Sequence, residues 1–545
     1  MKSSLPPRRL IPRWRPVSKT LETSEVESII DQPSQKLVFD RDVFDDSVDA
    51  WRDNPTAGHL GDVIAFSADD ELRPRIAAIV DDAVRLGHAV SDTQKSIFSE
   101  LREEVNDDPD DTHLGGRLAV QARVAQLRKE LLVAPDNVLA LLDLAQLQLA
   151  AGKQDAAERL LFTALNLAPN GRIVLRTAAR FFVHLGKLDR AHSLINRHPA
   201  TKEDPWLMAS EIALADAAGR SSTLLNAGRR MIRASKKSSR QLAELAGAVA
   251  HRELMEGSAR EARGYLRLAL EQPTDNVVAQ AMIDARQMGL RLDEPAIMQA
   301  VSRSSEAQLL QAWMTADEPA SELQALRWHA EEPFSSRPVQ FLTALYALQG
   351  DYSKALEWVQ RGLIADPSDD GLISNLAFAQ AAAGNDSAAQ LSIKRARFEG
   401  HDRIEPYFKA TEGLIALRRG DFDLARTLYR DAEQAFIKAN NESTAALCVA
   451  HYAKFAAQFS APNAVALAIE AAERVKKAPT IDGLILLGKL AHEPVEISLE
   501  EDAQRRLSQW VFDPESNTLT QKLGVTAKGA PAIVVQTSKP PTNRK

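Results

Sequence analysis

Apolar residues recur at helical spacing along most of the chain, and the pattern divides into pairs of helices. The segment VLALLDLAQLQLAAG (138–152) is apolar on nearly every side and stops at a glycine, whereas KQDAAERLLFTALNLAP (153–169) is amphipathic and stops at a proline. A helix that is apolar all round needs cover on every side. We therefore expect the two segments to form an antiparallel hairpin that packs against neighbouring hairpins.

The hairpin pattern repeats with a constant period. Self-similarity at a spacing of this size indicates an array of stacked helical hairpins. In each unit the glycine supplies the turn, and small alanines allow the two helices to approach closely. Three pairs of residues share a separation of 34 positions: Pro135 and Pro169, Gly152 and Gly186, and Ala157 and Ala191.

These residues resemble the tetratricopeptide repeat, which has small residues in both helices, glycine at the turn and proline at the end. The first unit carries Ala145, Gly152, Ala157, Leu161, Ala164 and Pro169. Later copies contain Gly350 and Gly384, again 34 residues apart, and the resemblance covers roughly 135–490, or about ten hairpins. It implies an all-α fold, a right-handed α-solenoid of antiparallel helical hairpins, that acts by binding other proteins.

The pattern divides the chain into six regions. The sequence predicts a basic, Pro-rich, extended or disordered arm (1–40), a short helical region with an acidic linker (41–115), a first repeat block (116–272), degenerate repeats (273–335), a second repeat block (336–490), and a terminal helix with a disordered tail (491–545).

Composition narrows the class of protein. Of 545 residues, 45% are hydrophobic but only 6% are aromatic, which suits close helix packing better than a β-sandwich. The net charge of −7 gives no whole-chain case for nucleic-acid binding. The chain start lacks the apolar core of a secretory signal, and no apolar run reaches the ~20 residues of a membrane span. We expect a soluble, cytoplasmic protein.

No complete catalytic, metal-binding or cofactor-binding motif occurs. Cys448 is the single cysteine, so an internal disulfide or a multi-cysteine metal site cannot form. A thiolate–imidazole pair with His451 is geometrically conceivable, although a buried small cysteine is commoner. The segment GLILLGKL (483–490) begins like a phosphate loop, but Leu490 stands where the motif needs Ser or Thr. We expect no enzyme, no metal and no cofactor.

An arginine stripe marks the second repeat. Arg172, Arg176 and Arg180 recur four residues apart and so share one helix face, which could receive carboxylates or phosphates bidentately or be plain surface. Leu142 and Gln146 replace the lysine and asparagine expected in relatives that bind chaperone C-termini, so that clamp is not predicted.

Two further basic features are candidates for partner binding. Residues 220–240 hold seven positive charges and no acid, including Arg229, Arg230 and Arg233, and form either an anionic docking patch or a solvated helix end. The first 20 residues hold six positive charges, no acid and four prolines. Their Arg13, Trp14 and Arg15 could dock on an acidic partner or a phosphate backbone, or the terminus is disordered or self-docked.

These observations predict a non-catalytic scaffold that mediates protein–protein interactions through the concave face of the solenoid, its partners being one or more proteins with acidic segments. The alternative is a regulatory module that binds nucleic acid or another polyanion through the basic arm and the 220–240 cluster.

Overall fold

The computed structural model describes residues 10–16, 41–56, 59–60, 63, 72–85, 112–234, 239–288, 295–492, 510–513 and 518–521. These residues belong to two units. Unit 1 comprises Met1–Pro16, Gln148–Glu158 and Val174–Lys545, and unit 2 comprises Val17–Leu147 and Arg159–Ile173. The acidic linker expected before residue 112 lies outside the described residues.

Unit 2 contains the first helices among the described residues. They are α3 (Arg41–Asp53), α5 (Arg73–Arg85) and α7 (Thr112–Val133). Phe44 and Trp51 of α3 share an apolar cluster with Ile76 and Val80 of α5. The turn between α8 (Val138–Ala150) and α9 (Gln154–Leu167) belongs to unit 1, so the boundary between the units crosses this first clear hairpin.

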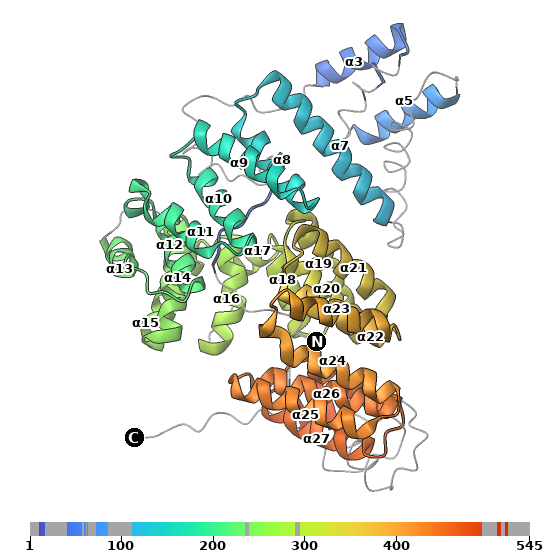
Figure 1. Cartoon of the computed structure of the whole chain (residues 1–545). Coiled ribbons are helices and arrows are strands. Elements are labelled where there is room, and N and C mark those ends of the chain that lie inside the picture. The colour runs from blue at the N-terminus through green and yellow to red at the C-terminus, as the bar shows by residue number, and fades with distance from the viewer. Residues whose placement is uncertain are drawn as a thin grey trace. The chain divides into compact units, whose positions relative to one another are not determined.

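Most of unit 1 is a series of helices in chain order, coloured from green to red in Figure 1. They are α10 (Arg172–His184), α11 (Leu188–Asn196), α12 (Pro205–Ala217), α13 (Leu225–Ala234), α14 (Ser239–Glu256), α15 (Ala259–Glu271), α16 (Asp275–Met288), α17 (Pro295–Val301), α18 (Ser305–Met314), α19 (Glu318–Glu331), α20 (Ser336–Gln349), α21 (Tyr352–Ala365), α22 (Asp370–Ala382), α23 (Asp386–Phe398), α24 (Glu405–Arg418), α25 (Phe422–Lys438), α26 (Glu442–Gln458), α27 (Ala464–Lys477) and α28 (Ile481–His492), with the short 3-10 helices η2 (Pro199–Lys202) and η3 (Asp402–Ile404).

The helices of unit 1 stack as consecutive hairpins. Within a hairpin, α14 packs on α15, α20 on α21 and α24 on α25. The first helix of a hairpin also packs on the first helix of the next, as α12 does on α14, α14 on α16, and α20 on α22. The stacked helices of unit 1 therefore form an α-solenoid, as the sequence predicts, and α16 to α19 continue it through the region 273–335.

The two helices of a hairpin differ in burial as their sequences do. Every residue from Pro338 to Leu348 in α20 is buried, which matches its apolar character on all sides. Its partner α21 buries one stripe, made by Ala355, Trp358, Val359, Gly362 and Ala365. The first helices are thus buried on nearly every side, whereas the second helices bury one face and leave the other exposed.

Left-handed turn residues explain why some repeats are hard to recognise from sequence. Gly350, which ends α20, has φ 88°, and Gly384, which follows α22, has φ 90°, a region that glycine enters without steric cost. The turn between α18 and α19 uses Ala316 with φ 55°. Asn440 and Ser460 take left-handed conformations after α25 and α26. The glycine landmark is lost at the hairpin turns between α18 and α19 and between α26 and α27, although the hairpin geometry persists.

A short β-hairpin lies in the region 491–545, for which the sequence predicts a helix and a disordered tail. β1 (Trp510–Asp513) pairs antiparallel with β2 (Thr518–Gln521), with Trp510 opposite Gln521. The strand Trp-Val-Phe-Asp is rich in aromatic and β-branched residues, which favour strands, but four residues are too few to show a clear alternation.

Among the described residues, no helix is both long and apolar enough to cross a bilayer.

The turn at Ala316 predicts a matched pair of stability changes. Ala316→Gly should raise the free energy of unfolding by about 1 kcal/mol, because an L-residue pays a steric cost in the left-handed region. Gly350→Ala should lower it by about 1 kcal/mol, since no atom lies within 4 Å of an added Cβ there and the cost is conformational alone. Denaturant unfolding followed by circular dichroism measures both. Equal unfolding midpoints for the two variants would contradict the assignment.

Candidate functional site

Residues 10–16, here called the docked segment, lie extended against unit 1. The sequence is Leu-Ile-Pro-Arg-Trp-Arg-Pro, and none of it is helical. Pro12 and Pro16 fix their own φ angles and favour an extended conformation in the residues before them. Of the alternatives left open by the sequence, the structure therefore shows this part of the basic arm docked on its own chain.

Apolar contacts anchor the docked segment at Leu10 and at Trp14. Leu10 is buried in the cluster of α14 and α16, where a Cβ on Gly247 would come within 3.1 Å of Leu10 Cδ1. Trp14 is only 1% exposed. Its ring meets Phe181 of α10 edge-on at 6.4 Å and Phe334, in the turn before α20, at 5.1 Å between centroids. Such aromatic contacts add to the free energy gained by burial.

The two arginines of the docked segment, one on each side of Trp14, meet carboxylates. Arg13 Nη1 lies 3.3 Å from Asp275 Oδ2, and its Nη2 pairs with Glu306. Arg15 Nη1 lies 2.7 Å from Asp275 Oδ2, and its Nη2 lies 2.8 Å from Glu331 Oε2. The main chain is held as well, because Trp14 N donates to Glu332 Oε1 at 3.4 Å and Asn276 Nδ2 donates to Ile11 O at 3.2 Å.

We call the four carboxylates Asp275, Glu306, Glu331 and Glu332 the acidic site. They come from the start of α16, the start of α18 and the end of α19. Groups outside the docked segment hold three of them: Arg337 Nη2 donates to Glu306 Oε1 at 3.1 Å, Ser305 Oγ to Glu331 Oε1 at 2.5 Å, and Trp328 Nε1 to Glu332 Oε2 at 2.8 Å. The helix stack therefore orients the acidic site independently of what occupies it.

The carboxylates of the acidic site act on the pKa of the Arg13 guanidinium. Burial acts to lower this pKa, but the carboxylates of Glu306 and Asp275 outweigh it and raise the pKa above its ordinary value. Arg13 is 11% exposed and stays charged, so a buried cation is matched by buried anions.

The arginine stripe of α10 is divided among different environments. Arg176 is buried, with Nη2 2.5 Å from Glu244 Oε2 of α14 and its guanidinium over the Trp206 ring at 4.9 Å. Arg180 lies over the Phe334 ring at 4.8 Å, next to the docked segment, and burial lowers its pKa. Arg172 begins α10 and is half-buried. The three residues therefore do not form one open anion-binding surface.

The 220–240 cluster is likewise largely engaged by its own chain. Arg229 pairs with Glu253, Arg233 Nη2 donates to Tyr265 Oη at 3.3 Å, and Arg220 lies 2.6 Å from Asp189. Arg230 is exposed. Residues 235–238, with Lys236 and Lys237, lie outside the described residues.

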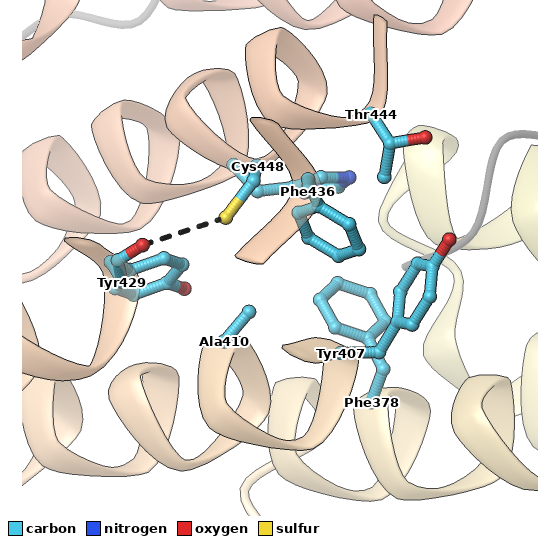
Figure 2. A pocket seen from close by; sticks show the side chains of 8 residues that line it. Phe378, Tyr407, Ala410, Tyr429, Phe436, Thr444 and Cys448 are labelled. Atoms are coloured by element: carbon cyan, nitrogen blue, oxygen red, sulfur yellow. Dashed lines mark hydrogen bonds between the residues drawn. The ribbon is translucent and has the colours of Figure 1, made fainter. Parts of the chain in front are cut away.

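The only cysteine, Cys448, is one of the residues that line a small cavity (Figure 2). It is lined by Phe378, Tyr407, Ala410, Tyr429, Phe436, Thr444, Cys448 and His451, and its volume is about 10 Å³, which is room for one water molecule. Burial raises the pKa of the Cys448 thiol to about 12 and lowers that of His451 well below its ordinary value. The thiol and the imidazole are thus both neutral, which disfavours a thiolate–imidazole pair.

The segment that begins like a phosphate loop is part of a packed helix. The segment 483–490 lies within helix α28, where Lys489 Nζ donates to Leu348 O at 2.7 Å. Within the described ranges, no three His, Cys, Asp or Glu side chains come close enough to hold a metal ion. His184 Nε2 contacts the carbonyl oxygen of Ala365 at 3.0 Å, and burial lowers the pKa of His184 to about 4.

Sequence reasoning found the arginines of the docked segment but not their partners. The acidic site consists of residues near helix ends, in QPTDN (272–276), SSEAQ (304–308) and HAEEP (329–333). Carboxylates at helix starts are ordinary caps in a sequence, so nothing distinguishes these.

Comparison with known proteins agrees with the repeat geometry. The family model for the tetratricopeptide repeat matches residues 138–161, from the start of α8 into α9. This match falls on the hairpin whose glycine and alanine spacing recurs along unit 1. The chain carries tetratricopeptide-like repeats.

Solved structures that match this chain include one of human IFIT1 and one of Naa15/Naa10, and no curated protein matches. The human IFIT1 dimer with PPP-AAAA is 16% identical, with 68% of this chain and 84% of that chain covered, at a TM-score of 0.24. Naa15/Naa10 bound to HypK-THB is 12% identical, with 85% and 89% covered, at a TM-score of 0.23. Superposition at this level assigns no function.

Docking of residues 10–16 predicts protection from proteolysis. Trp14→Ala should raise the rate of tryptic cleavage after Arg13 at least ~10-fold, because loss of a buried indole shifts the segment toward its released state. Arg230→Ala, which removes an exposed arginine, is the matched control and should leave the rate unchanged. Mass spectrometry of timed digests measures both, and equal rates in all three proteins would refute docking.

The neutral thiol predicts low reactivity of Cys448. With its pKa at about 12, the folded chain at pH 8 should hold about 1,000-fold less thiolate than a thiol of pKa 9. Reaction with a disulfide reagent should therefore be slow in the folded chain and fast in denaturant. Absorbance of the released thiolate reports this one residue, and similar rates in both conditions would show that Cys448 is accessible and ionised.

Proposed function

We propose that this protein is a non-catalytic scaffold that mediates protein–protein interactions through the face where the first helices of its hairpins gather. The observation that supports the proposal is the docked segment itself. Seven residues in extended conformation contact α10, α14, α16, α18 and the turn after α19. A surface that holds one extended segment by both side-chain and main-chain contacts has the properties of a peptide-binding surface.

The chemistry of this surface favours basic rather than acidic protein segments. The acidic site presents carboxylates, whereas the arginine stripe is partly occupied by Glu244. The proposal therefore differs from the sequence-based expectation, in which the basic residues predict acidic partners. The proposal therefore places partner recognition at the acidic site, with aromatic contacts from Phe181 and Phe334.

Co-purification tests the scaffold function. The full chain should recover the same proteins in repeated purifications from its source cells, and the variant Glu331→Ala should recover less of those that use the acidic site. Leu424→Ala, on the outer face of α25, is a control because Leu424 is exposed. Quantitative mass spectrometry measures recovery. Failure to recover any reproducible partner would count against the scaffold function as a whole.

The polyanion alternative has a separate test. Arg13, Arg15 and Arg229 already pair with carboxylates, so binding RNA or DNA would require these ion pairs to open. We expect a mobility-shift titration at rising salt concentration to show weak binding without a steep salt dependence. A steep loss of affinity with salt would instead support the polyanion function, because each released counterion adds to the slope.

A further inference from the structure

We propose that the acidic site binds, in trans, an extended segment of another protein in which two arginines flank an aromatic residue. The chain's own docked segment is then a built-in competitor for this site. The proposal rests on the scaffold function proposed above and specifies the chemistry of the partner and the way in which access to the site is limited.

The contacts define what an occupant needs. An aromatic ring fits between Phe181 and Phe334, and a guanidinium on each side of it reaches Asp275. The hydrogen bonds from Asn276 and to Glu332 involve the main chain of the occupant, which any extended segment offers. The site therefore specifies a short pattern of residue types and does not depend on the origin of the segment.

The buried carboxylates of the acidic site make an empty site unfavourable, so one basic segment leaves most readily when another replaces it. Glu306 and Glu332 are almost fully buried, at 2% and 4% exposure. Removing the cation from a buried ion pair leaves an uncompensated charge, which is strongly unfavourable. Release of the docked segment is therefore least costly when another basic segment replaces it. This restricts the trans occupant to a basic one.

The docked segment leaves part of the binding capacity of the site unused. Arg15 Nε is buried without a hydrogen-bond acceptor, and Arg15 Nη2, although close to Glu331 Oε2, is not aligned for a hydrogen bond with it. Arg13 and Arg15 also share one oxygen, Asp275 Oδ2. A segment whose second arginine aligns with Glu331 gains hydrogen bonds that the docked segment lacks.

Because the docked segment is part of the same chain as the acidic site, it competes with a trans segment and lowers the apparent affinity of that segment. The docked segment and the acidic site belong to the same chain, and both lie in unit 1. A segment tethered in this way acts at a high effective concentration. If it occupies the site nine-tenths of the time, the apparent affinity of a trans segment falls about tenfold, in proportion to the open fraction.

A binding assay with a synthetic peptide tests the proposal. The probe is the fluorescein-labelled peptide Leu-Ile-Pro-Arg-Trp-Arg-Pro, measured by fluorescence anisotropy against the full chain and against a full-length variant with Arg13→Ala, Trp14→Ala and Arg15→Ala. The variant should bind the peptide about tenfold or more tightly than the unchanged chain, because its site has lost the competitor.

Two controls separate the acidic site from non-specific attraction. A peptide in which both arginines are replaced by glutamate should not bind the triple variant. Adding Asp275→Asn and Glu331→Gln to that variant should weaken binding of the arginine peptide about tenfold or more, since the side chains keep their size and lose their charge. Circular dichroism and the unfolding midpoint establish that each variant is folded.

A second measurement needs no substitution. In the unchanged chain, rising concentrations of unlabelled peptide should increase hydrogen exchange at the amide of Trp14, which donates to Glu332 in the docked state. Unchanged exchange at saturating peptide would overturn the proposal, as would failure of the folded triple variant to bind the peptide. A dimer that forms by exchange of docked segments and excludes the peptide would assign the site to a second copy of this chain, and would also overturn it.

The outcomes distinguish this proposal from the scaffold function. If the peptide fails to bind while proteins still co-purify with the chain, another surface serves the scaffold. If the peptide binds while no partner co-purifies, the site is real but the cellular function is not supported.

Discussion

Burial of the first helix of each hairpin is the constraint on which the rest of the structure depends. Helices such as α12 and α20 are apolar on every side, so no single hairpin can shield them from water. Stacking of hairpin on hairpin is the arrangement that covers them, and it makes the solenoid a sum of neighbour contacts. The turn residues only shape this stacking, which is why Ala316 can stand where other repeats have glycine.

The acidic site is a consequence of that stacking. Its carboxylates belong to α16, α18 and α19, and each lies near a helix end, where chain turns bring successive hairpins together. Neighbouring hairpins contribute both the carboxylates and the groups that hold them, as Arg337 of α20 does for Glu306 of α18. A basic segment across several hairpins is therefore held by the order of the stack, and any change in stacking between α14 and α20 would alter its affinity.

The ion-pair partners of the arginines could not be predicted from the sequence. The helical spacing of Arg172, Arg176 and Arg180 predicted a shared face, and the three do lie on one helix. Their availability was not predictable, because a buried guanidinium requires a counter-charge and the partner of Arg176 is Glu244, 68 residues away. The basic N-terminal arm is a similar case: its charge and its tryptophan marked it as a binding element, but the sequence could not show that it binds the chain that carries it.

The sequence by itself determined the helical hairpins, their period and most of their turns, because these depend on local properties: apolar spacing, helix-stopping prolines and glycine at left-handed positions. Only the tertiary structure decided which charges meet. The ion pairs of Arg13 join residues 262 and 293 positions apart, and that separation is bridged by the summed geometry of several stacked hairpins. No local pattern encodes such a distance, so the acidic site becomes recognisable only when the stack is complete.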